Sequence, residues 1–362
     1  MNKEIAVVKS RKIFIDILRI LCCFLVIVNH TNSQIFLSVS SVSEGIGITY
    51  ILSMAYFYAS KIAVPIFFMI SGALLLNKDW DIKDFIKKRL LRYIIILIFF
   101  SAIYYIYYNK DNDIWHFKNI LIFLKNIYNV HITNAFWFLY SYLGILIMLP
   151  LLRKMVKHLS KYEYYYLFAI YIIIYSILPI AEKIFKVDGL SMFTRKLIFN
   201  ETIIYFILGH YLLNVYNIKK INSKRFFIIS CITFISYIIT SCIYTIITLN
   251  NKGEYDLFFA DTESIIRLLP SLSIFFIVYI ISEKLKLNNK VEKIIIWISK
   301  CTLGVYLISD LLIQLTRKIY DKLLVNNVQI LIAMVIWELI IFAVGVLITS
   351  VLKKVPILRK LL

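Results

Sequence analysis

Residues 11–31 read RKIFIDILRILCCFLVIVNHT, a stretch that is apolar enough to enter a lipid bilayer but holds ionisable side chains. Asp16 and Arg19 lie near its start, and His30 lies at its end. A charge inside a membrane span is costly, so such side chains normally face other protein groups and mark functional positions. The stretch therefore predicts a membrane helix with one side turned toward the protein interior.

The whole chain shares this apolar character. Of its 362 residues, 61% are hydrophobic and 16% aromatic, more than a soluble domain of this length can hide in a core. A helix needs about 20 mostly apolar residues to cross a bilayer, and we count ten such segments. We expect an all-α polytopic bundle that forms a single domain over residues 1–362. The ten predicted segments are 13–31, 50–76, 90–108, 136–152, 163–181, 197–216, 225–248, 264–283, 294–316 and 328–352.

The net charge of +20 follows the connections between these segments. If the N-terminus is cytoplasmic, 26 of the 41 Lys and Arg residues fall on the cytoplasmic side and 11 on the outer side. Cytoplasmic loops are enriched in Lys and Arg, so both termini are predicted to be cytoplasmic. The charge is thus a topology signal, and we expect contact with membrane lipid and no nucleic acid. The five cysteines lie in or beside the spans, which favours buried thiols over disulfides or a metal site.

Three outer connections are longer than the others: 33–47, 109–134 and 250–264. Loops of this size either shape a binding site or serve as solvated connectors. Glu201 and Arg267 lie at the outer ends of their spans, where contact with lipid headgroups explains them. Asp310 and Glu338 lie deeper and suit pairing inside the bundle.

Helical geometry places the three ionisable residues of the first span on one stripe. Asp16 and Arg19 are three residues apart, and His30 follows Arg19 by eleven residues, about three full turns. Roughly 20 Å along the axis separates the pair from the imidazole. A structural ion pair near the inner headgroups and an interfacial histidine explain them singly, but the shared stripe favours a function.

The second span, 50–76, carries Lys61 in its outer third and Pro65 four residues later. Pro65 removes a backbone hydrogen bond and can open room for a buried site. Lys61 either contributes to such a site or snorkels outward. Ser71 and Gly72 either belong to the site or permit a close helix contact.

Six further features of the sequence occur in a fixed order: Asp16-x-Leu18-Arg19 with His30, VPIFFMISGALLL (64–76), FWFLYSYLGILIMLPLL (136–152), YFILGHYL (205–212), CTLGVYLIS (301–309) and VPILRKLL (355–362). Taken in this order, the six segments resemble the acyltransferase-3 family of membrane acyltransferases. That family includes O-acetyltransferases of bacterial surface polysaccharides and the intercellular-adhesin membrane proteins. Two departures stand out: Ser309 and Asp310 replace the histidine that usually ends the late segment, and Lys61 stands where the related enzymes often have Arg.

The resemblance implies an O-acetyltransferase in a bacterial plasma membrane. It would move acetyl from cytoplasmic acetyl-CoA to a hydroxyl of a surface polysaccharide or its lipid-linked precursor. Histidine has an unperturbed pKa suited to activating a hydroxyl, so His30 is the candidate base, or alternatively the carrier of the acyl group. Arg19 would hold the phosphates of CoA with Asp16 orienting it.

Lys61 would stabilise negative charge on the acyl oxygen or bind the glycan acceptor, and Ser71 is a further candidate for binding the acceptor. Trp137 and Tyr140 open the span 136–152 and either stack on a sugar ring or belong to the aromatic belt of the membrane.

Two other classes of protein fit a polytopic chain. An exporter or flippase of the adhesin type would be expected to show more helices and an internal repeat, and we find no repeat. A glycan polymerase would more often carry a large outer loop rich in Arg, and 109–134 contains no Arg. Homo-oligomer formation stays open.

Overall fold

The computed structural model describes residues 12–39, 47–110, 117–129, 132–187, 200–216, 218, 224–253, 255–260, 264–326 and 329–362. All regular structure in these ranges is helical. Nine helical segments within them are long and apolar enough to cross a membrane, which confirms the predicted polytopic helix bundle. The predicted span 197–216 is instead a shorter apolar helix, Glu201–Val215. The nine segments are Ile13–Thr31, Ile48–Leu75, Ile82–Tyr108, Asn134–His158, Lys161–Phe185, Lys224–Asn251, Ile265–Lys284, Asn289–Val325 and Ile330–Leu352.

The chain forms two compact units, each built from two stretches of sequence. The first unit combines Met1–Ala73 with Tyr165–Thr302, and the second combines Leu74–Tyr164 with Leu303–Leu362. The expected single domain over 1–362 stays a prediction.

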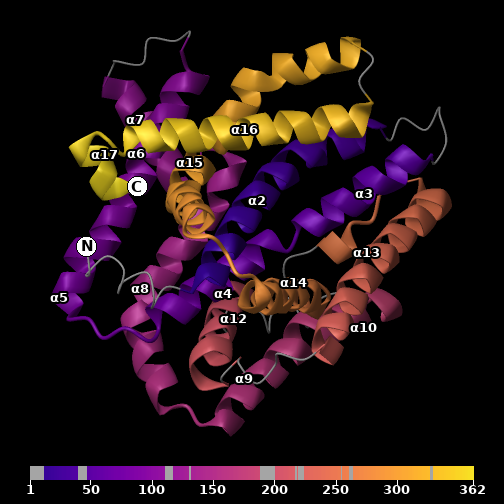
Figure 1. The fold of residues 1–362 in the computed structure, drawn as a ribbon, viewed down its shortest axis with the longest axis horizontal. Coiled ribbons are helices and arrows are strands. Elements are labelled where there is room, and N and C mark those ends of the chain that lie inside the picture. The colour runs from indigo at the N-terminus through magenta and orange to yellow at the C-terminus, as the bar shows by residue number, and fades with distance from the viewer. Residues whose placement is uncertain are drawn as a thin grey trace. The chain divides into compact units, whose positions relative to one another are not determined.

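In the first unit, α2 contacts α3 and α14, and α13 contacts the same two helices (Figure 1). Two helices of this unit begin as ordinary capping rules predict. At the start of α12, the Asn200 side chain accepts a hydrogen bond from the Thr202 amide. In α10, Pro179 lies in the first turn. Helices of this unit, some shared with the second, are α2 (Ile13–Val39), α3 (Ile48–Ser60), α4 (Ala63–Leu75), α9 (Lys161–Ile172), η3 (Ile173–Ile177), α10 (Leu178–Phe185), α12 (Glu201–His210), η4 (Tyr211–Val215), α13 (Lys224–Lys252), α14 (Ile265–Lys284) and the start of α15 (Asn289–Val325).

Helix α13 shows how these helices are sorted between lipid and protein. Isoleucines recur on it every three or four residues and are about half exposed, as a lipid-facing stripe requires. Four hydroxyl side chains on α13 are buried instead, those of Ser230, Ser241, Thr245 and Thr248, and Thr245 contacts the Tyr58 hydroxyl of α3. These hydroxyls thus turn inward and the isoleucines outward, the arrangement that a bilayer favours, whereas Ser236 and Thr240 are exposed. The exposed stripe is Ile228, Ile232, Ile235, Ile239, Ile243 and Ile247.

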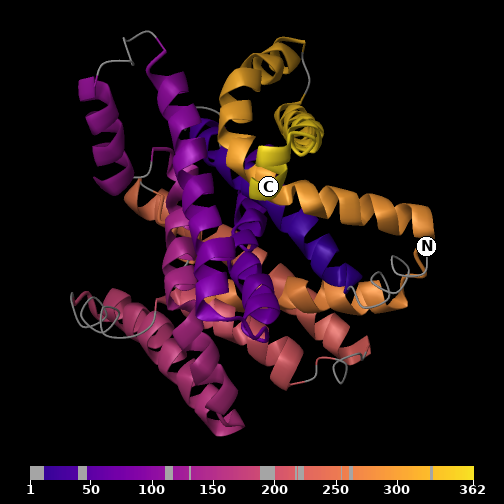
Figure 2. The ribbon, with the colours of Figure 1, turned by 90° about the vertical axis from the view of Figure 1, so that its left-hand side faces the viewer.

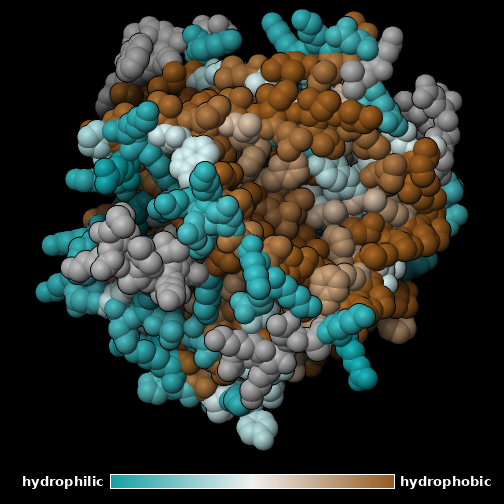
Figure 3. All heavy atoms as spheres, viewed as in Figure 1, coloured by the Kyte–Doolittle hydropathy of each residue, from teal (hydrophilic) through white to brown (hydrophobic). Residues whose placement is uncertain are grey.

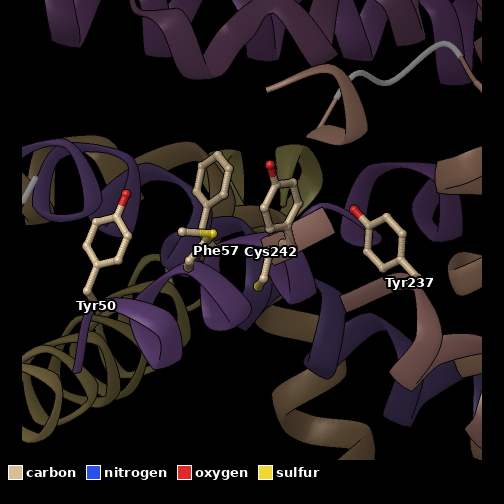
Figure 4. Packing of buried hydrophobic residues seen from close by; sticks show 6 residues of the cluster. Tyr50, Phe57, Tyr237 and Cys242 are labelled. Carbon is tan, nitrogen blue, oxygen red and sulfur yellow. The ribbon is translucent and has the colours of Figure 1, made fainter. Parts of the chain in front are cut away.

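An aromatic cluster joins α3 to α13. Tyr50 and Phe57 of α3 pack with Tyr237 and Cys242 of α13 (Figure 4). The Tyr58 ring lies edge-on to Tyr237, with 6.2 Å between centroids. This packing fixes the outer end of the second span, where Lys61 follows directly after α3.

Two glycines bring α4 and α12 into backbone contact. A Cβ atom on Gly72 would overlap the Phe206 carbonyl, and one on Gly209 would overlap the Met69 carbonyl. The contact is reciprocal, since each glycine faces the residue three positions before its partner glycine. The interpretation of Gly72 as a residue for close helix packing is therefore confirmed.

In the second unit, α17 lies against α6, where the Arg92 guanidinium donates to the Leu361 carbonyl at 3.0 Å. Exposed apolar side chains cover α16, as Figure 3 shows for one face of the molecule. The helices that complete this unit are α5 (Ile82–Phe85), η1 (Ile86–Leu90), α6 (Leu91–Tyr108), α7 (Phe117–Asn129), η2 (Asn134–Phe136), α8 (Trp137–His158), α16 (Ile330–Leu352) and α17 (Pro356–Leu361).

Two ion pairs tie α8 to the residues before α5. Asp79 accepts from Lys157 at 2.5 Å and from Arg153 at 3.2 Å. The hydrogen bond from Lys157 and the charge of its ammonium group lower the pKa of the Asp79 carboxyl.

The expectation that 109–134 is a loop is wrong for residues 117–129, which form α7. This helix lies beside α6, and the Tyr105 hydroxyl donates to the Asn119 carbonyl at 3.3 Å (Figures 1 and 2). Ile120, Leu124 and Tyr128 are exposed at four-residue spacing, which is typical of a helix lying in a membrane interface.

Candidate active site

The N-terminal end of α2 holds a buried carboxylate. Asp16 is 1% exposed and accepts a hydrogen bond of 2.6 Å from the Ser299 hydroxyl of α15. The Arg19 guanidinium lies 4.0 Å from the same Asp16 oxygen, and its side chain is 34% exposed. The predicted neighbours are therefore brought together, and Arg19 keeps an exposed surface while Asp16 is held from two sides.

His30 lies on the same unbroken helix, which continues beyond it to Val39 rather than ending there. The shared stripe of Asp16, Arg19 and His30 thus follows from regular helical geometry. The imidazole is half-buried. Its neighbour in sequence, Asn29, provides the link to the second span, because the Lys61 ammonium donates to the Asn29 amide oxygen.

Lys61 is held inward rather than snorkelling. Its ammonium nitrogen lies 3.9 Å from the centroid of the Phe57 ring, a cation–π contact. Among the residues that the structure describes, its partners are the neutral Asn29 amide and this ring, and neither is a carboxylate. The contact with Asn29 holds the Lys61 ammonium group against α2, at the residue that precedes His30 in the sequence.

Pro65 interrupts the backbone hydrogen bonding of the second span at Lys61. Pro65 has no N–H to donate to the carbonyl of the residue four positions earlier, which is Lys61, and α3 ends at that turn. The Arg267 guanidinium of α14 donates to this carbonyl at 3.1 Å. Arg267 is 4% exposed, so the expectation that it meets lipid headgroups is wrong.

Arg267 is the site residue that sequence reasoning missed. Pro65 is an indirect sequence signal for such a residue, because a proline in a membrane helix leaves a backbone carbonyl that another hydrogen-bond donor must satisfy. The sequence does not say which donor that is. Glu201 is buried as well, at 8% exposed, rather than lying among headgroups.

The remaining candidates show mixed surroundings. Ser71 is half-buried on α4 beside Gly72. Tyr140 donates its hydroxyl to the Ile127 carbonyl at 2.8 Å and so joins α8 to α7. Trp137 begins α8 and is half-buried, with its ring edge-on to Phe138. Their roles in binding a substrate stay predictions.

Ser309 and Asp310, at the end of the late segment, form hydrogen bonds with uncharged groups. Ser309 is fully buried and donates to the Tyr306 carbonyl at 2.9 Å. Asp310 accepts from the Tyr108 hydroxyl at 3.2 Å and from Thr133, whereas Glu338 is fully buried. In the described ranges no cluster of three or more His, Cys, Asp or Glu residues is arranged to hold a metal ion. Cys22, Cys23, Cys242 and Cys301 are buried, as expected.

The arrangement brings together groups that suit polar transfer chemistry. A half-buried imidazole follows directly after Asn29, the residue to which the Lys61 ammonium donates, and a partly exposed guanidinium lies on the same helix stripe as the imidazole. The first pair suits activation of a hydroxyl and stabilisation of an oxyanion, and the guanidinium suits a phosphate.

Comparison with known proteins gives one match. The acyltransferase domain family matches residues 12–354, which include the whole arrangement from Asp16 to Arg267 and nearly the whole chain. No curated protein and no solved structure was found to match. The protein is thus a multi-pass membrane protein with an acyltransferase domain, and the chain belongs to the acyltransferase-3 family.

Proposed function

We propose that the protein is a membrane O-acetyltransferase of the bacterial plasma membrane. It moves acetyl from cytoplasmic acetyl-CoA to a hydroxyl of a surface polysaccharide or its lipid-linked precursor. The observation that carries this proposal is the contact between Lys61 and Asn29, which joins the second span to α2 at the residue before His30.

The transfer needs a base and a site for negative charge. In the direct route, the His30 imidazole takes the proton of the acceptor hydroxyl while its oxygen attacks the thioester carbonyl. The C–S bond then breaks, an ester forms, and the CoA sulfur recovers the proton. In the relayed route, the imidazole nitrogen attacks the thioester carbonyl and CoA leaves as its thiolate. The acceptor hydroxyl then attacks the acetyl-imidazole, the ester forms as the imidazole leaves, and the hydroxyl proton ends on the CoA sulfur. Both routes require a neutral imidazole.

Lys61 would stabilise the negative oxygen of the tetrahedral intermediate. Its described partners are the Asn29 amide and the Phe57 ring, and neither is a carboxylate that would compete with a developing oxyanion. The Arg267 bond to the Lys61 carbonyl fixes the backbone from which this side chain extends.

The donor would be held at the inner end of α2. Arg19 has the planar donor fork that suits a phosphate, and its partly exposed side chain is accessible to a ligand. Asp16, buried and bonded to Ser299, would orient Arg19 rather than contact the donor.

The proposal predicts that His30→Ala abolishes acylation, with a loss on the order of a hundredfold or more for a missing general base. The measurement is the ratio of O-acetyl groups to sugar residues in surface polysaccharide from the native host, by proton NMR. The matched control is His158→Ala, because His158 is an exposed residue at the end of α8. This control should acetylate normally.

Normal acetylation by His30→Ala at wild-type protein levels would exclude His30 from the mechanism. Loss of the polysaccharide from the surface, with acetylated material retained inside the cell, would support the exporter instead.

A further inference from the structure

In the second unit, a tyrosine hydroxyl bonds to both ends of one turn of α15. The Tyr104 hydroxyl of α6 donates to the Leu307 carbonyl at 3.2 Å and accepts from the Leu311 amide at 3.0 Å. These are the two groups that an undisturbed α-helix would join to each other. Asp310 lies in this turn.

The turn presents a connected polar surface. Gln314 donates to the Tyr108 hydroxyl at 2.8 Å, and that hydroxyl donates to Asp310 Oδ2 at 3.2 Å. Thr133, which is buried, donates to the same oxygen from behind. Tyr108 is 44% exposed and Gln314 is also exposed, so the network opens outward.

The Asp310 carboxylate keeps capacity for a ligand. A carboxylate has about four lone-pair sites, and the two bonds from described residues both go to Oδ2. Oδ1 accepts no hydrogen bond from any residue in the described ranges. Ser309 beside it is fully buried and bonded within α15, so Asp310 is the member of this pair that a ligand can reach.

We infer that Asp310, Tyr108 and Gln314 form a subsite that binds hydroxyl groups of a neutral sugar ring of the acceptor. A carboxylate accepts from sugar hydroxyls and repels phosphate, the amide of Gln314 can both donate and accept, and an exposed tyrosine ring provides a face for stacking. The predicted topology places the ends of α6 and α15 that carry these residues on the outer side, where a glycan acceptor lies. The subsite rests on the proposed function, which supplies the acceptor.

The test uses the full chain in lipid nanodiscs, with acetyl-CoA and the host's surface polysaccharide after chemical removal of its O-acetyl groups. Asp310→Asn keeps the size of the side chain and an oxygen for Thr133 and Tyr108, but it loses the charge. We expect the KM for polysaccharide to rise about tenfold, because hydrogen bonds to a charged group are stronger than those between neutral groups. The KM for acetyl-CoA and the melting temperature should stay at wild-type values.

Two further variants sharpen the result. Tyr108→Phe should raise the KM for polysaccharide by a smaller factor, about threefold, because it removes a neutral hydroxyl. Asp321→Asn is the matched control, since Asp321 is an exposed residue of the same helix paired with Arg317. Its kinetics should be unchanged.

An unchanged KM for polysaccharide in Asp310→Asn would overturn the subsite while wild-type transfer upholds the proposed function. Equal increases in both KM values, or a lowered melting temperature, would overturn it in favour of a structural role. Absence of transfer by wild-type protein would overturn the proposed function and the subsite together.

Discussion

At the scale of single residues, the second span shows how a backbone defect becomes part of a site. Pro65 leaves the Lys61 carbonyl without a helical donor, and a bare carbonyl is costly in a membrane. Arg267 satisfies it at 3.1 Å from another helix. The same residue thus presents its carbonyl to Arg267 and its ammonium to Asn29, so the lysine is anchored at both ends.

This arrangement predicts a coupling between Arg267 and Pro65. Arg267→Met should lower the melting temperature in detergent, because an unsatisfied buried carbonyl costs about 1–3 kcal/mol. In a Pro65→Ala background, the substituted alanine supplies the missing amide, so Arg267→Met should cost less. A double-mutant cycle of melting temperatures measures the difference. Equal losses in both backgrounds would contradict a role for Arg267 in satisfying the carbonyl.

Much of the residue-level site could be predicted because it lies within one helix. The spacing of Asp16, Arg19 and His30 defines a stripe whatever surrounds it, and α2 is continuous over that length. The partners from other helices could not be predicted. Ser299 is 283 positions from Asp16, and no local pattern marks it among the other serines. Arg267 could not be recognised either, because its position near a helix end resembles that of an interfacial residue.

At the scale of elements, α4 and α12 depend on two glycines. Gly72 and Gly209 each face a carbonyl of the opposite helix, so their Cα atoms provide the contact surface. The hydrophobic effect does not drive helices together within lipid, so close van der Waals packing of this kind stabilises the helix pair instead. The short apolar helix that begins at Glu201 is thereby fixed to the second half of the span that carries Lys61.

Substituting these glycines should separate the two helices. Gly72→Ala and Gly209→Ala place a methyl group on a backbone carbonyl, and we expect each to destabilise the protein by at least the roughly 1–3 kcal/mol typical of overpacking. Gly144→Ala on α8 is the matched control, since its Cβ meets no atom within 4 Å. That change should leave the melting temperature equal or slightly higher, because Ala favours a helix. Equal melting temperatures for all three variants would exclude the close contact.

Element boundaries can be predicted well where apolar runs are long and poorly where they are short. The first span begins at Ile13, as expected, whereas its helix continues beyond the predicted end at residue 31 to Val39. Residues 117–129 resemble a loop because Lys118 and Lys125 interrupt a run too short to cross a bilayer, yet the run forms the helix α7. An interfacial helix carries less apolar sequence than a span and so is harder to distinguish from a loop.

At the scale of the whole molecule, charge and hydropathy describe different properties of the chain. Exposed isoleucines on α13 and exposed apolar residues on α16 mark surfaces suited to lipid. They say nothing about which end of a helix is cytoplasmic, because lipid faces are alike at both ends. Only the unequal distribution of Lys and Arg between alternate connections carries that information.

The charge distribution predicts that Lys286 is cytoplasmic and Lys110 is outside, and both are exposed residues beyond the ends of spans. Lys286→Cys and Lys110→Cys therefore form a matched pair for labelling with a membrane-impermeant maleimide. In intact cells only the cysteine at 110 should react, and opening the cells should make the one at 286 reactive. The wild-type chain is the background control, since its four buried cysteines and the half-buried Cys231 should react weakly. The reverse pattern would place acetyl-CoA opposite to the Arg19 end of α2 and would contradict the proposed direction of transfer, because the cytoplasm supplies the donor.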